Sequence, residues 1–155
     1  MFGAKVIAKG EQIEVLMATD LPGILIVDDN EDNRYTLQLM LESDGHERIT
    51  CAAGGNQAIA LVEKEKFSLV LLDLMMPEMD GFAVVAALQK EAGWRDIPVI
   101  VITSLDLDAK DRARLNAGVQ FVMVKEKFRP ADLVERIRRL VHSKSPVSTE
   151  MEAAS

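Results

Sequence analysis

The sequence predicts a doubly wound α/β protein in which helices cover both faces of a five-stranded parallel sheet. From Gly23 onward, short apolar runs alternate with amphipathic segments, a rhythm typical of consecutive βαβ units. The apolar runs are mostly continuous and rich in Val and Ile, which favours strands buried on both faces. The amphipathic segments carry apolar residues at helical spacing, so each is expected to lay one stripe against the sheet.

Five strand-helix units can be counted along the chain. The expected strands are Ile24–Val27, Arg48–Cys51, Leu69–Asp73, Val99–Ile102 and Phe121–Val124. The expected helices are Asp32–Ser43, Asn56–Lys64, Gly81–Lys90, Ala109–Asn116 and Pro130–Val141. Gly45 follows the first helix where a left-handed residue is needed, Asn56 is the expected cap of the second, and Pro130 suits the first position of the fifth.

The last helix also carries three arginines beside its apolar stripe. We expect them to form a solvated face near the C-terminal end, where positive charge is favoured; they are Arg136, Arg138 and Arg139.

A chain of 155 residues has room for one domain with a proper core, so we expect a domain over residues 23–142 with two flanks. Within residues 1–22, the runs Lys5–Ala8 and Gln12–Met17 predict a short hairpin, an arm that pairs with another chain, or a linker. Residues 143–155 lack a periodic apolar stripe and are expected to be a disordered tail.

Composition excludes several functional classes. The formal net charge of −7 disfavours direct binding to nucleic acid. Cys51 is the only cysteine, which excludes an intramolecular disulfide, fits a reducing compartment and suggests a buried strand thiol. No apolar run approaches the length of about eighteen residues that spans a bilayer, so we expect a cytoplasmic protein without membrane contact.

Three carboxylates are expected to converge at one edge of the sheet. Asp28 and Asp29 follow the first strand and Asp73 closes the third, and the carboxyl ends of parallel strands share one edge. The first two alone are as well explained by a turn and a helix cap, but an uncompensated carboxylate after the apolar run ending at Leu72 would be costly. Because neighbouring carboxylates repel and oxygen ligands favour a hard cation, we predict a Mg²⁺ site.

The fourth and fifth strands are each followed by a residue that suits phosphoryl chemistry. Thr103, with Ser104 beside it, offers a hydroxyl, and Lys125 offers an ammonium group. Together with the carboxylates they supply an acceptor, a metal site, a hydroxyl donor and a cation, which are the parts that phosphoryl transfer requires.

These residues resemble the receiver domains of response regulators in two-component signalling, over roughly Gly23–Val141. The resemblance is carried by four segments in the family's order, Ile24–Asn30 (ILIVDDN), Leu71–Gly81 (LLDLMMPEMDG), Val99–Ser104 (VIVITS) and Val122–Lys125 (VMVK). It implies a flavodoxin-like, CheY-like sheet with strand order 2-1-3-4-5.

The resemblance also implies roles for the residues that match its motifs. Asp73 is similar to the phosphoacceptor, with Asp28, Asp29 and the Met75 backbone carbonyl as the other Mg²⁺ ligands, directly or through water. Thr103 resembles the switch hydroxyl and Lys125 its cationic partner. The loop after the acceptor is matched by Pro77 and Gly81.

Two departures from the family pattern affect the switch end of the site. The usual proline after the lysine is absent, so a cis peptide is not expected there, and Lys127 is a fallback for the cation. Val122 stands where the family places a mobile aromatic, and Phe121 lies one residue early, on the opposite strand face. Either the strand shifts register so that Phe121 serves, or the usual aromatic is lacking.

The resemblance implies a phosphoacceptor that takes its phosphoryl group from a histidine kinase or histidine phosphotransfer protein, as in a phosphorelay. It would act on a downstream protein target through a surface change, rather than as an enzyme. A second copy of the chain, in a homodimer, is a further candidate partner. Because Met75 and Leu105 are apolar and flank the expected path of water, we expect slow autodephosphorylation. The alternatives are an unphosphorylated interaction module and an aspartyl-nucleophile phosphohydrolase, although Met75 stands where the latter needs a second Asp.

Overall fold

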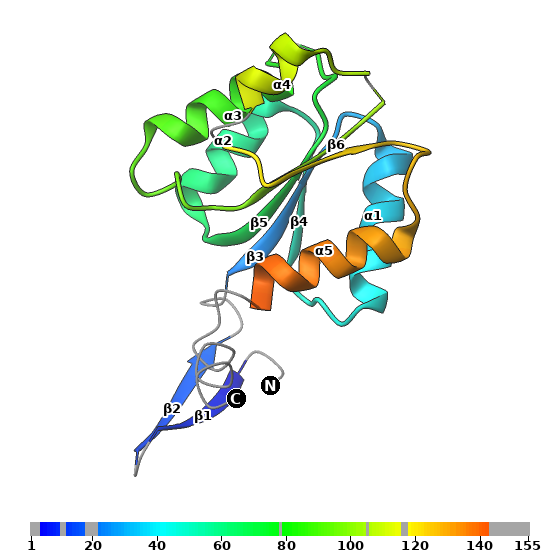
Figure 1. The fold of residues 1–155 in the computed structure, drawn as a ribbon. Coiled ribbons are helices and arrows are strands. Elements are labelled where there is room, and N and C mark those ends of the chain that lie inside the picture. The colour runs from blue at the N-terminus through cyan, green and yellow to red at the C-terminus, as the bar shows by residue number, and fades with distance from the viewer. Residues whose placement is uncertain are drawn as a thin grey trace, which may run out of the picture.

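The computed structural model describes residues 4–9, 12–17, 22–77, 79–104, 106–115 and 118–142, and its core is a five-stranded parallel sheet flanked by helices (Figure 1). The strands are β3 (Gly23–Val27), β4 (Ile49–Ala52), β5 (Phe67–Leu72), β6 (Val99–Thr103) and β7 (Phe121–Val124). The helices are α1 (Glu31–Ser43), α2 (Gly55–Lys64), α3 (Gly81–Lys90), α4 (Ala109–Leu115) and α5 (Pro130–His142). The strand order β4-β3-β5-β6-β7 confirms the predicted doubly wound topology.

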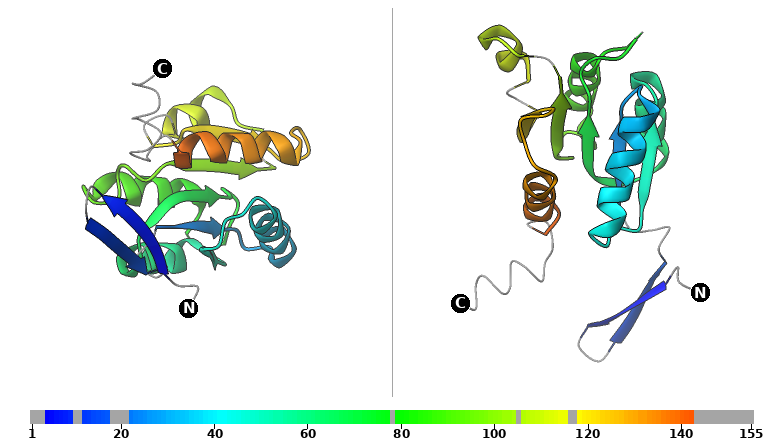
Figure 2. Two further views of the ribbon diagram at one scale, coloured as in Figure 1. Left: turned by 90° about the horizontal axis from the view of Figure 1, so that it is seen from below. Right: turned by 90° about the vertical axis from the view of Figure 1, so that its right-hand side faces the viewer.

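The sheet is buried on both faces because successive residues of each strand enter different hydrophobic clusters. Leu25 and Val27 of β3 pack toward α2, α3 and α4, whereas Ile24 and Ile26 pack toward α1 and α5. Figure 2 shows this separation, with α1 and α5 on one side of the sheet. The apolar runs of the sequence therefore have the two-sided burial that parallel sheets require.

Local capping explains where the helices begin, and it corrects one expectation. Asn30 caps α1, since its side-chain oxygen accepts the Asn33 N–H at 3.0 Å. Asn56 was the expected cap of α2, but that expectation is wrong, because the cap position is Gly54 and makes no side-chain bond. Gln57 instead accepts the Ala53 N–H at 2.6 Å and so holds the entry to the helix.

Other boundaries differ from the expected ones by one or two residues. The third predicted strand begins earlier, at Phe67, and ends at Leu72, so Asp73 lies just beyond β5. Gly45 has the expected left-handed backbone after α1, with φ +94°. Cys51 is half-buried on β4 rather than fully buried, and burial raises the pKa of its thiol. The expected end of α4 at Asn116 lies outside the described residues.

The arginines of α5 do more than form a solvated face. Arg138 donates from Nε to both carboxylate oxygens of Asp44, at 3.0 and 3.3 Å, and thereby links α5 to the end of α1. This hydrogen bonding lowers the pKa of the Asp44 carboxyl. The Arg136 guanidinium lies over the Phe121 ring at 4.5 Å, which joins α5 to β7.

An antiparallel pair of strands precedes the sheet, formed by β1 (Ala4–Lys9) and β2 (Gln12–Met17). Figure 1 shows this pair apart from the five-stranded sheet. The tail expected over residues 143–155 lies outside the described part of the chain. Among the described helices, none combines the length and apolar character needed to cross a bilayer.

Gly81 begins α3 directly against the main chain of the loop that follows β5. A Cβ atom at this position would lie 2.5 Å from the Asp73 carbonyl oxygen and 2.6 Å from the Leu74 Cα. Because both neighbours are backbone atoms, relief requires a shift of α3 or of the loop. Gly81 thus allows the helix to approach the loop closely.

We predict that Gly81→Ala lowers the free energy of unfolding by about 2 kcal/mol, the usual cost of overpacking a tight contact. Urea unfolding at neutral pH measures the change. Gly93→Ala is the matched control, because nothing lies within 4 Å of a Cβ there, and its effect should stay within about 0.5 kcal/mol. Equal stability of the two variants would contradict the prediction.

Candidate functional site

Three carboxylates meet at the carboxyl edge of the sheet. Asp28 and Asp29 follow β3, and Asp73 follows β5, the neighbouring strand. One oxygen from each lies within 4.8 Å of the others. Asp28 is only 2% exposed and Asp73 6% exposed, whereas Asp29 is open to solvent. The cluster therefore has two buried members and one that faces outward.

Main-chain hydrogen bonds continue the sheet for one residue beyond the strands and hold the two buried aspartates in place. The Asp28 N–H donates to the Ala52 carbonyl at 3.1 Å, and the Asp73 N–H donates to the Val27 carbonyl at 2.9 Å. The Asn30 N–H donates to Asp28 Oδ1 at 2.9 Å, and the Met75 N–H donates to Asp73 Oδ1 at 3.2 Å. Each buried carboxylate thus has one oxygen engaged by the loop that follows it.

Lys125 supplies a positive charge to both buried carboxylates. Its Nζ lies 3.3 Å from Asp28 Oδ2 and 3.4 Å from Asp73 Oδ2. The main-chain N–H of Lys125 donates to the Thr103 carbonyl at 2.8 Å, so the lysine is anchored to the end of β6. Lys127, the fallback candidate, instead borders a hollow beside Phe128 and α5. The structure therefore brings Lys125, and not Lys127, to the acidic cluster.

The residues after Lys125, where the family usually has a proline, form a turn. The Lys127 N–H donates to the Val124 carbonyl at 3.0 Å, and Glu126 has a positive φ of 71°. This is the turn position where glycine or asparagine is usual. No cis peptide occurs among the described residues, in agreement with the sequence expectation.

Thr103 is the last residue of β6 and is fully buried. It pairs with Val124 in the register of the sheet, and Ser104 beside it is exposed. The exposed Ser104 hydroxyl lies 3.7 Å from the Met75 sulfur, toward which it donates. The ends of β5 and β6 are therefore bridged at the surface by these two side chains.

The register of β7 distinguishes the two alternatives for the aromatic position. Phe121 pairs with Ile100 and Val122 with Val101, without an irregularity. Phe121 packs on the α1 and α5 side of the sheet, whereas Val122 packs on the side of α2, α3 and α4. The strand has not shifted, so a valine occupies the position where the family resemblance leads one to expect an aromatic ring.

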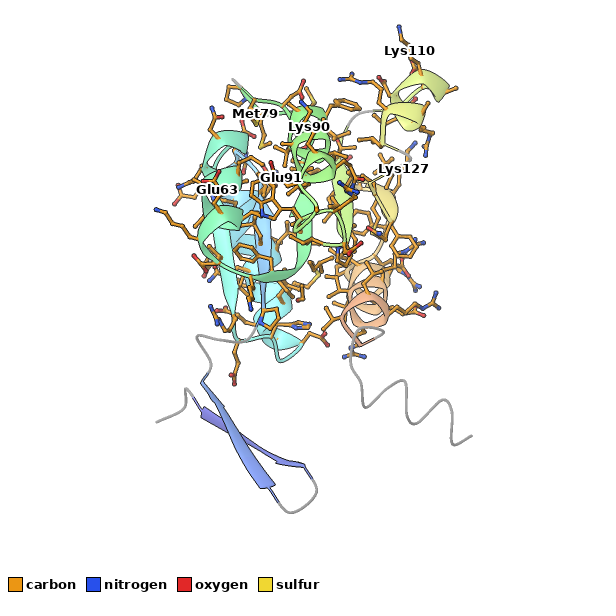
Figure 3. All side chains as sticks on the ribbon, turned by 90° about the vertical axis from the view of Figure 1, so that its left-hand side faces the viewer. Glu63, Met79, Lys90, Glu91, Lys110 and Lys127 are labelled. Atoms are coloured by element: carbon orange, nitrogen blue, oxygen red, sulfur yellow. The ribbon has the colours of Figure 1, made fainter. Side chains whose placement is uncertain are left out.

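The loop from β5 to α3 borders the acidic cluster and a neighbouring hollow. Met75 is 51% exposed on this loop, and the hollow is lined by Asp29, Leu74, Met75, Met76, Pro77, Asp80 and Phe82. Met79 packs over the start of α2 at Gly55 (Figure 3). Leu105, the other residue expected to border the path of water, lies outside the described residues.

Sequence reasoning missed Arg34, which also holds the acidic loop. Its Nη1 donates to the Asp28 main-chain carbonyl at 2.7 Å. The signal available in the sequence was its spacing, because Arg34 lies four residues after the cap Asn30, on the same side of the first helical turn. One turn of α1 thus returns a positive charge to the end of β3.

Burial dominates the ionisation of Asp73. Desolvation raises the pKa of its carboxyl, and the negative charge of Asp28 raises the pKa further, while the Met75 N–H and Lys125 lower it in part. The net result is a pKa above the ordinary value of 3.8. The folded chain therefore disfavours the charged form of Asp73 relative to the unfolded chain.

A raised pKa in the folded state means that ionised Asp73 lowers stability above its ordinary pKa. We predict that Asp73→Asn raises the free energy of unfolding at pH 7 in metal-free buffer, and that this gain shrinks as the pH falls toward 4. Urea unfolding over this pH range measures it. Asp29→Asn, which changes an exposed carboxylate, should give a smaller gain, and a less stable Asp73→Asn protein at pH 7 would contradict the prediction.

Curated relatives resemble this chain over most of its length. A probable transcriptional regulator, ycf27 of Porphyra purpurea, is 37% identical over 128 residues, which are 83% of this chain and 51% of that protein. The protein PilH of Pseudomonas aeruginosa is 42% identical over 83 residues, 54% of this chain and 68% of that protein. The chain spans about half the length of the ycf27 relatives that it matches.

Solved receiver domains have the same fold. The receiver domain of a Syntrophus aciditrophicus histidine kinase matches with a TM-score of 0.73 at 29% identity, covering 81% of this chain and 94% of that one. The receiver domain of a Pseudomonas aeruginosa sensor histidine kinase was solved with magnesium in its active-site cleft. It matches with a TM-score of 0.69 at 29% identity, covering 77% of this chain and 97% of that one. The family model of the response regulator receiver domain matches residues 24–138, and this chain belongs to that family of two-component signalling proteins.

Proposed function

We propose that this chain is a phosphoacceptor receiver in which Asp73 takes a phosphoryl group from a phosphohistidine. The observation that carries the proposal is the buried Asp73 carboxylate, which shares the carboxyl edge of the sheet with two further carboxylates and a lysine. Such a group is a poor structural element, because its burial without a full counter-charge costs stability. It suits a nucleophile whose charge is used in a reaction.

The donor set fits a Mg²⁺ ion. Three carboxylates within 4.8 Å face one ammonium group, so negative charge is left over, and hard oxygen donors suit a hard divalent cation. We infer that Asp28, Asp29, Asp73 and the Met75 backbone carbonyl hold the ion, directly or through water. When bound, Mg²⁺ would neutralise charge that develops on the phosphoryl oxygens.

The chain's own residues perform the remaining tasks. The Met75 N–H orients Asp73 through Oδ1, and Lys125 lies against Oδ2, from which its ammonium group can pass to a phosphoryl oxygen. In the transfer, a carboxylate oxygen bonds to phosphorus and the bond from phosphorus to the histidine nitrogen breaks. The product is an acyl phosphate on Asp73.

We infer that Thr103 and Lys125 respond to the new phosphoryl group. The two are already joined through the Thr103 carbonyl, so a shift of either is transmitted to the ends of β6 and β7. Partners would read the altered surface around β6, α4 and β7, which is the general logic of a phosphorylation switch. The donor would be a histidine kinase or histidine phosphotransfer protein, and the reader a downstream protein or a second copy of the chain.

The alternative of an unphosphorylated interaction module is suggested by the residues after Lys125, where the usual proline is absent. The turn at Glu126 absorbs that change while Lys125 still reaches both buried carboxylates, which favours the phosphoacceptor. A phosphohydrolase is disfavoured because Met75 offers no acid or base two residues after Asp73. Neither alternative explains the buried acidic cluster as well.

We predict that the intact chain gains the mass of one phosphoryl group when incubated with a small phosphodonor and Mg²⁺. Chelation of Mg²⁺ and the Asp73→Asn change should each abolish the adduct, because they remove the counter-charge and the acceptor. Intact-protein mass spectrometry at neutral pH measures the adduct. Asp132→Asn is the control, since Asp132 lies on α5 and pairs with Arg129 instead of the site.

A wild-type chain that gains no adduct would overturn the proposed function. An adduct that persists in Asp73→Asn would move the acceptor elsewhere. Multiple turnover of a phosphate ester would favour the hydrolase instead.

We predict that Met75→Asn shortens the lifetime of the phosphorylated chain about fivefold, because an amide can orient an attacking water through a hydrogen bond and a thioether cannot. Loss of the adduct after removal of the phosphodonor, followed by mass spectrometry, gives the rate. Met75→Leu, which keeps the position apolar, supplies the reference rate. An Asn variant that decays no faster than the Leu variant would contradict the role given to this position.

A further inference from the structure

Met75 differs from the other methionines whose side chains the structure describes. It is 51% exposed, whereas Met76 and Met123 are buried and Met40 and Met79 are partly buried in the core. Oxidants in solution reach a thioether in proportion to its exposure. Among these methionines, Met75 is therefore the most exposed to solvent.

Met75 is also the methionine closest in sequence and hydrogen bonding to the buried nucleophile. It lies two residues after Asp73, and its N–H donates to Asp73 Oδ1 at 3.2 Å. Its sulfur lies 3.7 Å from the Ser104 hydroxyl at the end of β6. The thioether thus lies at the carboxyl edge of the sheet, between the ends of β5 and β6, and it lines the same hollow as Asp29. We call this edge the rim.

We propose that Met75 is an oxidation site, and that its sulfoxide shortens the lifetime of phosphorylated Asp73. The inference rests on the proposed phosphoacceptor function and adds to it a regulation by peroxide. In the reaction the sulfur attacks one peroxide oxygen, the O–O bond breaks, and a sulfur–oxygen bond forms. Sulfur loses two electrons to the peroxide, whose second oxygen leaves as hydroxide and becomes water by taking the proton of the transferred oxygen.

The chemical change is large at this position. A thioether is a weak hydrogen-bond acceptor, whereas a sulfoxide oxygen is a strong and polar one. The Ser104 hydroxyl is already directed at the sulfur and can donate to the new oxygen. An acceptor on the rim can also hold and orient water next to the acyl phosphate, which the apolar side chain does not do.

The first experiment tests the site without any phosphorylation. The full chain is treated with limiting hydrogen peroxide, and peptide mapping follows each methionine over time. Met75 sulfoxide is expected to form before sulfoxides of Met40, Met76, Met79 and Met123. Oxidation of Met75 no faster than of the buried Met76 would overturn the inference.

The second experiment measures the consequence. The peroxide is removed, the chain is phosphorylated with a small phosphodonor and Mg²⁺, and loss of the adduct is followed by mass spectrometry. We expect decay about fivefold faster than in untreated protein, the effect of one added hydrogen bond to the attacking water. Treatment with methionine sulfoxide reductase should restore the original rate.

Two variants separate Met75 from the other methionines. Met75→Leu should show no change in decay upon peroxide treatment, whereas Met40→Leu, which removes a partly buried methionine of α1, should keep the wild-type response. An equal response in Met75→Leu, or unchanged decay of oxidised wild-type protein that phosphorylates normally, would overturn this inference alone. Failure of untreated protein to form any adduct would overturn the proposed function together with it.

Discussion

The electrostatic balance between Lys125 and the two buried carboxylates is the constraint on which the candidate site depends. Parallel strands place Asp28 and Asp73 side by side at one edge, and burial together with the charge of Asp28 raises the pKa of the Asp73 carboxyl. Lys125 reaches both at 3.3 and 3.4 Å, but one ammonium group cannot neutralise these two carboxylates together with Asp29. The negative charge that remains is compatible with a divalent cation at this edge.

The parts of the fold that follow from local patterns could be predicted from the sequence. Two-sided burial produces the continuous apolar runs of β3 and β6, and the position of a residue directly after a strand determines that it lies at the carboxyl edge. The proximity of Asp28 and Asp73 could therefore be predicted from their positions at the ends of two strands, without knowledge of any side-chain contact. The glycine at position 45 likewise predicted the left-handed backbone that follows α1.

Contacts that depend on long side chains were less accessible to prediction. Asn56 has the residue type of a cap, yet Gln57 supplies the local hydrogen bond, because a longer amide can reach back to Ala53. The pairing of Arg138 with Asp44 joins residues from opposite ends of the domain, and nothing near either residue in the sequence indicates its partner. Arg34 reaches the Asp28 carbonyl by the same flexible geometry.

The turn at Glu126 shows how a departure from the family pattern can leave Lys125 in contact with both buried carboxylates. Lys125 is positioned by its hydrogen bond to the Thr103 carbonyl, which belongs to the sheet, so the residues after it can adopt another turn without moving the ammonium group. The same strand, however, presents Val122 toward α4 and commits Phe121 to α5 beneath Arg136. A valine has no ring to exchange between buried and exposed positions. Under the proposed function, we therefore expect a signal that starts at Thr103 to pass through displacement of the β6 and β7 ends, because Val122 offers no aromatic ring that could rotate at its position.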